Sequence, residues 1–522
     1  MPKKTRTGRY LPPGLESANC AVALWTGWCG QEDSNFHGLS ATATSRLRVY
    51  QFRHGRERGR GGRLAARGTG SKMKDLWAEA RRLLTLAWPV ALTNLHWIGL
   101  NLIDTLLVGH ASTHELGHLT AGRAITYVTI VCALAALSGI LVFAARADGA
   151  GEPARAGDAW RQGMWLAGMM AVPAGAALWI GADALMAFAG VPADLRVGGA
   201  FYVRMMALAY PAQLAFIATS YFLEGISRPR VAMLINFASF PVNAALAWAL
   251  IGGHGGMPAL GAGGAALGTA LTVTIAAGAI LIYVHRMGDA AHWGVARMAE
   301  PFARRWRRAW REGVALRSFA IAPGVSAALE LIGFSVLLAL STRFGDSTAG
   351  AFQGAVAFHN ISIAASIGLG SAAGVRVGNA VGAGEGHQVA RRGWLAAGLA
   401  LAVLLVFALV YRLEAYALMP IISSDPAVVA GGAAMLTRLA PWLPFDGVQL
   451  VFLFALRSLG DQVWAGAISI VSFFGVMGGL GWWWVHRGEG PDALVDALIA
   501  GTLVAALLQG GRFALKAREA AP

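Results

Sequence analysis

The sequence contains twelve apolar stretches, each long enough to cross the hydrocarbon core of a bilayer as one helix. A core of about 30 Å needs roughly 20 helical residues. We expect membrane helices at 84–108, 119–145, 159–182, 197–224, 230–253, 260–285, 314–342, 348–374, 393–419, 427–456, 462–486 and 491–511. So many long apolar stretches predict an integral membrane protein.

Continuous apolarity favours helices over strands in these stretches. Strands of a membrane barrel alternate apolar and polar residues over about ten positions, and no stretch here does so. The composition agrees, because 56% of the 522 residues are hydrophobic, only 14% are charged and the mean hydropathy is +0.53. The three cysteines, Cys20, Cys29 and Cys132, match neither a metal knuckle nor a redox pair. We predict an all-α integral membrane fold that needs no disulfide.

The first 72 residues are basic, with 13 lysine or arginine residues against 4 acids. They include the sequence HGRERGRGGR at 54–63 and no apolar run that could serve as a signal peptide or anchor. Such a segment can bind RNA or act as a transit peptide. We favour a disordered extension, or an upstream start codon with Met73 as the functional beginning, and we expect no nucleic-acid partner.

Arginine is concentrated in the loops that follow even-numbered spans. The segment 286–317 carries eight arginines, whereas the opposite loop at 109–118 has none. Because cationic loops stay in the cytoplasm, we predict that both termini are cytoplasmic. The sequence PFARRWRRAWRE at 301–312 is typical of an amphipathic helix on an anionic leaflet. The predicted domains are a lobe at 73–286, a cytoplasmic linker at 287–312 and a second lobe at 313–522.

The two halves of the chain resemble each other at a nearly constant offset, which indicates a duplicated six-helix bundle. The matched positions are Pro89 with Pro323, Arg146 with Arg376, Gly151-Glu152 with Gly384-Glu385, Pro211 with Pro444, and Leu223 with Leu456. An even number of spans in each half makes the two repeats parallel. We therefore expect two six-helix lobes around a central cavity, an architecture that favours alternating access over a static pore.

Five landmarks occur in order within residues 75–515. They are NLIDTLLVGH at 101–110, FLEGISRPR at 222–230, PALGAGGAALGTA at 258–270, RVGNAVGAGEG at 376–386 and FDGVQLVFLFALRSLGD at 445–461. With these landmarks taken together, the chain resembles the multidrug and toxic compound extrusion (MATE) family, in particular its bacterial NorM-like branch. The resemblance implies a monomeric antiporter among the lipids of the bacterial inner membrane. It implies export of small organic cations in exchange for Na⁺ or H⁺, with no cofactor and no enzymatic activity.

Among the carboxylates within the predicted spans, three matter most: Asp104, Glu330 and Asp446. A charge at bilayer depth costs about 2.5–3.5 kcal/mol on insertion scales, so such residues are rare without a function. The resemblance implies that Glu330 and Asp446 form a cation site in the second lobe and that Asp104 is a protonation or ion site in the first. The alternative is that each acid is paired with a nearby arginine or helix end and only holds helices together.

Two amides are candidate partners of these acids. Asn243 matches a family asparagine that accompanies the aspartate of the first helix, and Gln449 follows Asp446 by three residues on the same helical face. The chain departs from the family at Ala247, where a second aspartate is frequent, and at Phe352 and Ala357, where histidine and asparagine are usual. The departure at Ala247 predicts a first-lobe site that is poorer in charge, whereas those at Phe352 and Ala357 argue against a specific role for the eighth span.

Two other transporter classes remain as alternatives. A flippase for lipid-linked oligosaccharides or peptidoglycan precursors has the same two-lobed plan, but its cavity is cationic, whereas the mid-span charges here are acids. The major facilitator superfamily also has parallel six-helix repeats. Its basic signature after the second helix is not matched by ARADGAGEPARAG at 145–157. An organic cation is therefore the favoured substrate.

One motif points to an enzyme or a metal site. The sequence HELGH at 114–118 fits H-E-x-x-H, in which two histidines one turn apart bind zinc beside a glutamate base. It falls in the short loop between the first two spans, and Gly117 is a poor residue for a rigid ligand helix. We interpret the motif as accidental for a protease and predict no required metal. Zinc binding by this segment, with His110 as a third ligand, stays open.

Overall fold

The computed structural model describes residues 69–296 and 302–521. Within those residues, 11 helices are long and apolar enough to cross a membrane, or 12 when one bent pair counts as a single span. Each of the twelve predicted stretches lies within one of these spans or extends beyond it by one residue only. The prediction of an all-helical, multi-pass membrane protein is confirmed.

The first half of the chain forms six spans from eight helices. These are α2 (Thr69–Ala111), α3 (Thr113–Leu137) with α4 (Gly139–Gly149), α5 (Pro153–Phe188), α6 (Ala193–Ala207) with α7 (Tyr210–Gly225), α8 (Arg230–Gly252) and α9 (Gly261–Arg286). Ser112 begins α3 by accepting a hydrogen bond from the Glu115 N–H. Gly253 ends α8 with a positive φ of 73°, which glycine adopts without steric cost.

The second half repeats this pattern after a short helix, α10 (Phe302–Glu312). Its spans are α11 (Val314–Ser341), α12 (Asp346–Gly382), α13 (Gly386–Leu418), α14 (Pro426–Leu439) with α15 (Leu443–Ser458), α16 (Gln462–Ser469) with α17 (Gly479–His486), and α18 (Asp492–Ala520). A π-helical stretch, η5 (Ile470–Gly478), joins α16 to α17.

The internal repeat is visible in the positions at which two spans break. The fourth span bends by 50° between α6 and α7, and Pro211 occupies the first turn of α7. The tenth span breaks at a 3-10 turn, η4 (Ala440–Trp442), and Pro444 occupies the first turn of α15. Proline lacks the N–H that a continuous helix needs, so matched prolines place a helix start at the same point in both halves.

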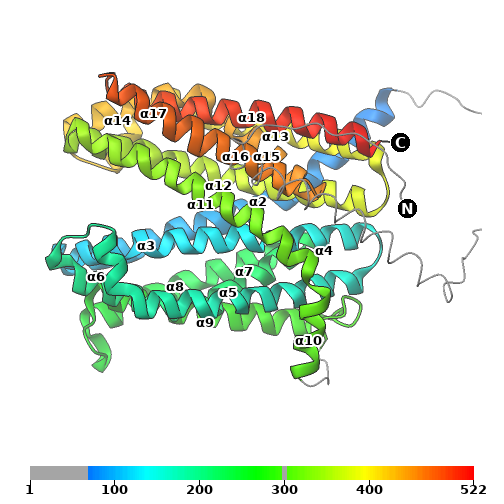
Figure 1. Ribbon diagram of the computed structural model, residues 1–522, viewed down its shortest axis with the longest axis horizontal. Coiled ribbons are helices and arrows are strands. Elements are labelled where there is room, and N and C mark those ends of the chain that lie inside the picture. The colour runs from blue at the N-terminus through cyan, green and yellow to red at the C-terminus, as the bar shows by residue number, and fades with distance from the viewer. Residues whose placement is uncertain (1–68, 297–301, 522) are drawn as a thin grey trace, which may run out of the picture. The chain divides into compact units, whose positions relative to one another are not determined.

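The first span of each half packs into the core of the other half. Leu83 and Ala87 of α2 belong to the apolar cluster of the second half, while Leu316 and Phe319 of α11 belong to that of the first. Figure 1 shows α2 and α11 between the group α13–α18 and the group α5–α9. A side chain at Gly368 of α12 would crowd the backbone of α2, so glycine permits this close approach.

The predicted domains are only partly covered by the structure. Of the predicted basic extension at 1–72, residues 1–68 lie outside the described residues, and residues 69–72 belong to α2, which begins at Thr69. In the linker at 287–312, residues 297–301 are likewise outside, and α10 occupies the predicted amphipathic segment. The domain boundaries and the central cavity stay predictions.

Candidate functional site

Asp446 lies at the break in the tenth span, in the first turn of α15. The N-terminus of a helix carries a partial positive charge, which favours a carboxylate there. Its side chain is buried, with 5% of the residue exposed, and Gln449 donates to Oδ1 across 3.4 Å from one turn further on. The prediction that these two residues lie on one helical face is confirmed.

The neighbour that sequence reasoning missed is His359 on α12. Its Nε2 lies 3.3 Å from Oδ2 of Asp446, and the ring is buried. A histidine inside the predicted span 348–374 should have been treated like the acids, because any ionisable residue at bilayer depth is a candidate.

This cluster has hydrogen-bonding capacity that the protein itself does not use. Oδ2 of Asp446, Oε1 of Gln449 and Nδ1 of His359 are buried, and none has a hydrogen-bond partner among the described residues. Buried polar atoms are rarely left without partners, since each costs about 1–3 kcal/mol. Carboxylate and amide oxygens suit a hard cation, and the carboxylate also suits a proton.

Glu330 on α11 is not in contact with Asp446. It makes no hydrogen bond or ion pair within the described part of the chain, and its side chain is partly exposed. The structure therefore does not join the two predicted acids directly.

Asp104 on α2 forms a second buried cluster, in the first half. Oδ2 accepts a hydrogen bond of 2.9 Å from Thr269 of α9, whose hydroxyl oxygen accepts one of 3.1 Å from Asn243 of α8. Asp104 is 3% exposed and Asn243 is fully buried. Within the described part of the chain, Oδ1 of each of these two residues lacks a hydrogen-bond partner, so two unused oxygens occur here as well.

Sequence reasoning also missed Thr269, which connects the predicted pair. A hydroxyl within an apolar span gave no charge signal, although the residue lies in the landmark 258–270. Asn243 reaches Asp104 through this threonine and not directly. The two clusters belong to different halves, and no residue is shared between them.

A network of hydrogen bonds joins the two halves at one end of the helices. We call this the terminal end, because α2 begins there and α18 ends there (Figure 1). Arg376 of α12 binds Glu79 of α2 through two nitrogens, at 2.6 and 2.8 Å. Asn379 of α12 donates to the Ala145 carbonyl at 2.8 Å and to Asp148 at 3.1 Å.

Two further contacts complete this network. Arg146 of α4 donates to the Ser458 carbonyl at 3.0 and 2.9 Å, and Ser371 of α12 donates to Glu224 of α7 at 2.6 Å. Among the described residues, every hydrogen bond between the two halves lies in the terminal-end part of its helices. The halves are therefore fastened together at the terminal end.

The matched segments of both halves now decide the family. The sequence model of the MatE family matches residues 89–249 and 324–483, one match in each half and more than half of the chain together. The chain belongs to the MatE family.

Relatives of this MatE protein span nearly its whole membrane part. The "Probable multidrug resistance protein NorM" of Caulobacter vibrioides is 29% identical over 426 residues, which cover 81% of this chain and 89% of the relative. The "Multidrug resistance protein PmpM" of Pseudomonas aeruginosa is 26% identical over 452 residues, covering 85% and 92%. MatE proteins are membrane transporters and not enzymes, as the resemblance implied.

A solved structure supports the same MatE fold. The eukaryotic MATE transporter AtDTX14 superimposes with a TM-score of 0.76 at 17% identity, covering 85% of this chain and 98% of that one. At this identity the likeness shows the fold alone.

Proposed function

We propose that this protein exports small organic cations across the bacterial inner membrane in exchange for inward-moving Na⁺ or H⁺. The names of the NorM and PmpM relatives support drug-like substrates. The observation that carries the exchange is the carboxylate of Asp446, which is buried, faces His359 and keeps one oxygen without a hydrogen-bond partner.

Competition for this carboxylate explains how an ion gradient can drive export. Burial favours the neutral or ion-bound form of an acid, and a nearby organic cation favours the charged form. A bound Na⁺ or proton and a bound substrate therefore weaken each other. Glu330 is a further carboxylate within a span of the second half and adds negative charge to that half.

Asp104 has the same features in the first half. Among the described residues, Oδ1 of Asp104 and Oδ1 of Asn243 have no hydrogen-bond partner. This cluster is therefore a second position for a proton or ion. With Ala247 where the family frequently has an acid, we assign it a proton in preference to a complete Na⁺ shell.

The network at the terminal end supports alternating access. With this end fastened, the protein is in the state that loads an ion and releases substrate at the opposite end. α10 carries Arg304, Arg307, Arg308 and Arg311 and lies at the terminal end in Figure 1. Because basic segments stay in the cytoplasm, we place the terminal end and both termini there. A single chain contains both clusters, which is consistent with a monomer.

The test is export of ethidium by the purified full chain in proteoliposomes under an imposed Na⁺ or pH gradient. We compare the wild type with Asp446→Asn, which keeps the volume and removes the charge. The matched control is Asp496→Asn, which changes a partly exposed aspartate paired with Arg438 in the same half.

Export by the wild type and the control but not by Asp446→Asn supports the proposal, and the effective gradient identifies the ion. Export by Asp446→Asn at the wild-type rate would refute coupling at this residue. Absence of export by folded wild type under both gradients would refute cation export and favour the flippase alternative.

A further inference from the structure

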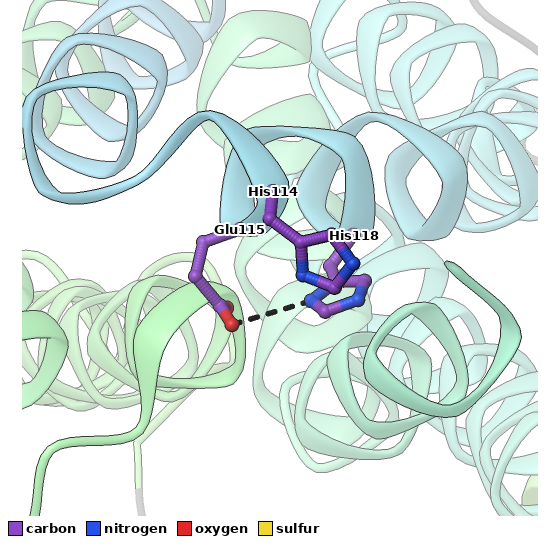
Figure 2. A group of neighbouring side chains, drawn as sticks. All are labelled: His114, Glu115 and His118. Atoms are coloured by element: carbon purple, nitrogen blue, oxygen red, sulfur yellow. Dashed lines mark ion pairs between the residues drawn. The ribbon is translucent and has the colours of Figure 1, made fainter. Parts of the chain in front are cut away.

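Three potential metal ligands meet at the first turn of α3. His114, Glu115 and His118 each place one ligand atom within 4.8 Å of those of the other two (Figure 2). The cluster lies near the ends of the helices opposite the terminal end, on different residues from the Asp104 and Asp446 clusters. Nothing in the proposed exchange cycle uses these three side chains.

Helical geometry brings the two imidazoles together. Residues four apart lie on the same helical face, and the rings of His114 and His118 have centroids 4.4 Å apart. Oε1 of Glu115 lies 3.3 Å from Nδ1 of His118. Figure 2 shows the carboxylate and both rings turned toward a common point.

Neighbouring helices hold this arrangement in place. Oε2 of Glu115 accepts a hydrogen bond of 2.7 Å from the Ala262 N–H at the start of α9. Gly261 has a positive φ of 54°, and a side chain there would clash with Glu115. Gly198 of α6 likewise leaves room for the ring of His118. Such outer contacts orient the ligands of metal sites, and their loss typically lowers affinity by about 10–100-fold.

We propose that His114, Glu115 and His118 form a binding site for a divalent transition-metal ion such as Zn²⁺. Two imidazole nitrogens and one carboxylate oxygen are a common three-ligand set for zinc. Zn–N bonds of about 2.0–2.1 Å require the ligand atoms to draw closer. The exposed side chain of His114 can make this adjustment, and its exposure leaves a fourth position open to water.

The site binds a metal but does not have the arrangement of a protease. In H-E-x-x-H proteases the glutamate acts as a free base beside the ion. Here one oxygen of Glu115 is held by α9 and the other is directed at the ligand position. A bound ion would therefore connect the first turn of α3 to the start of α9.

The experiment measures metal binding to the purified full chain, after removal of any affinity tag and of bound metal with a chelator. Equilibrium dialysis against Zn²⁺ gives stoichiometry and affinity, and the visible spectrum of added Co²⁺ reports the ligand geometry. The variants are His114→Ala, which changes an exposed side chain, and Glu115→Gln, which keeps an acceptor for Ala262. The matched control is His110→Ala, an exposed histidine whose Nδ1 contacts the Leu106 carbonyl of its own helix.

We expect one ion per chain for the wild type and for His110→Ala. Affinity should fall by at least about 10-fold in His114→Ala and in Glu115→Gln, with loss of the Co²⁺ spectrum. Wild-type affinity in both variants would overturn the assignment, as would the absence of a stoichiometric ion on the wild type. Each variant is first shown to be folded by its thermal unfolding in detergent.

Discussion

The guanidinium of Arg376 on α12 holds the carboxylate of Glu79 on α2 in a two-pronged ion pair, with nitrogen–oxygen distances of 2.6 and 2.8 Å. The two residues are 297 positions apart and belong to different halves of the chain. Arg392 of α13 lies 3.8 Å from the same carboxylate. One acid at the terminal end thus lies against two arginines of the second half.

Glu79→Gln should weaken the closure of the terminal end. The amide leaves Arg376 without its carboxylate partner, while Arg392 keeps its ion pair with Glu385. Removing one partner of a buried pair costs about 3–5 kcal/mol. We expect a longer and broader distance distribution between spin labels at Arg155→Cys and His387→Cys, measured by pulsed electron resonance in a cysteine-free background.

Arg438→Gln is the control for this experiment. Arg438 pairs with Asp492 and Asp496, and all three residues belong to the second half. The label distance should keep its wild-type value in this variant. An unchanged distance in Glu79→Gln would show that the pair does not hold the terminal end closed.

Thr269→Val tests the hydrogen-bond chain of the first half. The substitution keeps the shape of the side chain but leaves Asp104 without its donor and Asn243 without its acceptor. Because unsatisfied buried polar groups cost about 1–3 kcal/mol each, we expect a lower midpoint of thermal unfolding in detergent. Thr274→Val is the control, since its hydroxyl bonds only the Ala270 carbonyl of its own helix. Equal midpoints for the two variants would contradict the role of Thr269.

His359→Gln tests whether the imidazole shares a proton with Asp446. The imidazole can take up and release a proton, whereas the amide of glutamine keeps polar atoms but cannot. We expect the initial rate of ethidium export to depend on pH differently in this variant, while export itself survives. The control is His387→Gln, an exposed histidine at the start of α13. A pH profile identical to that of the wild type would exclude His359 from the exchange.

Asp289→Asn should destabilise the folded protein by an amount that does not vary with pH in the physiological range. Arg228 holds the pKa of the Asp289 carboxyl down to about 2, through hydrogen bonds of 3.0 and 2.6 Å in the segments outside the membrane. A lowered pKa stabilises the folded state above the unfolded value of about 3.9, and that stability is lost as the pH falls toward 2.

We therefore expect Asp289→Asn to lower the midpoint of thermal unfolding by the same amount between about pH 5 and about pH 8. The difference from the wild type should shrink only in stronger acid. A difference that changes across the neutral range would show that Asp289 titrates there and that Arg228 does not keep it charged.

The membrane-spanning helices could be predicted from the sequence because the length of an apolar stretch is a local property. The position of Asp446 followed from the landmark at 445–461, whereas the break before α15 was not predicted, since 427–456 is a single predicted stretch; Pro444 is the local feature that accounts for it. The match of Pro211 with Pro444 indicated the repeat, and both residues begin a helix after a break.

Contacts between distant residues could not be predicted from one sequence. The pair Glu79 and Arg376 joins helices whose approach depends on packing, and nothing local distinguishes Glu79 from a solvated residue near a helix start. Thr269 was missed because a hydroxyl in an apolar span costs little and bears no charge. His359 was missed although the rule applied to Asp446 covers it equally.

The central claim is that a coupling ion and the exported cation compete for Asp446. The direct measurement is the affinity of the purified chain for ethidium as a function of Na⁺ concentration at fixed pH, and of pH without Na⁺. We predict that wild-type affinity falls as one of these ions increases, and that Asp446→Asn binds more weakly with no such dependence. Wild-type ion dependence retained in Asp446→Asn would contradict the claim.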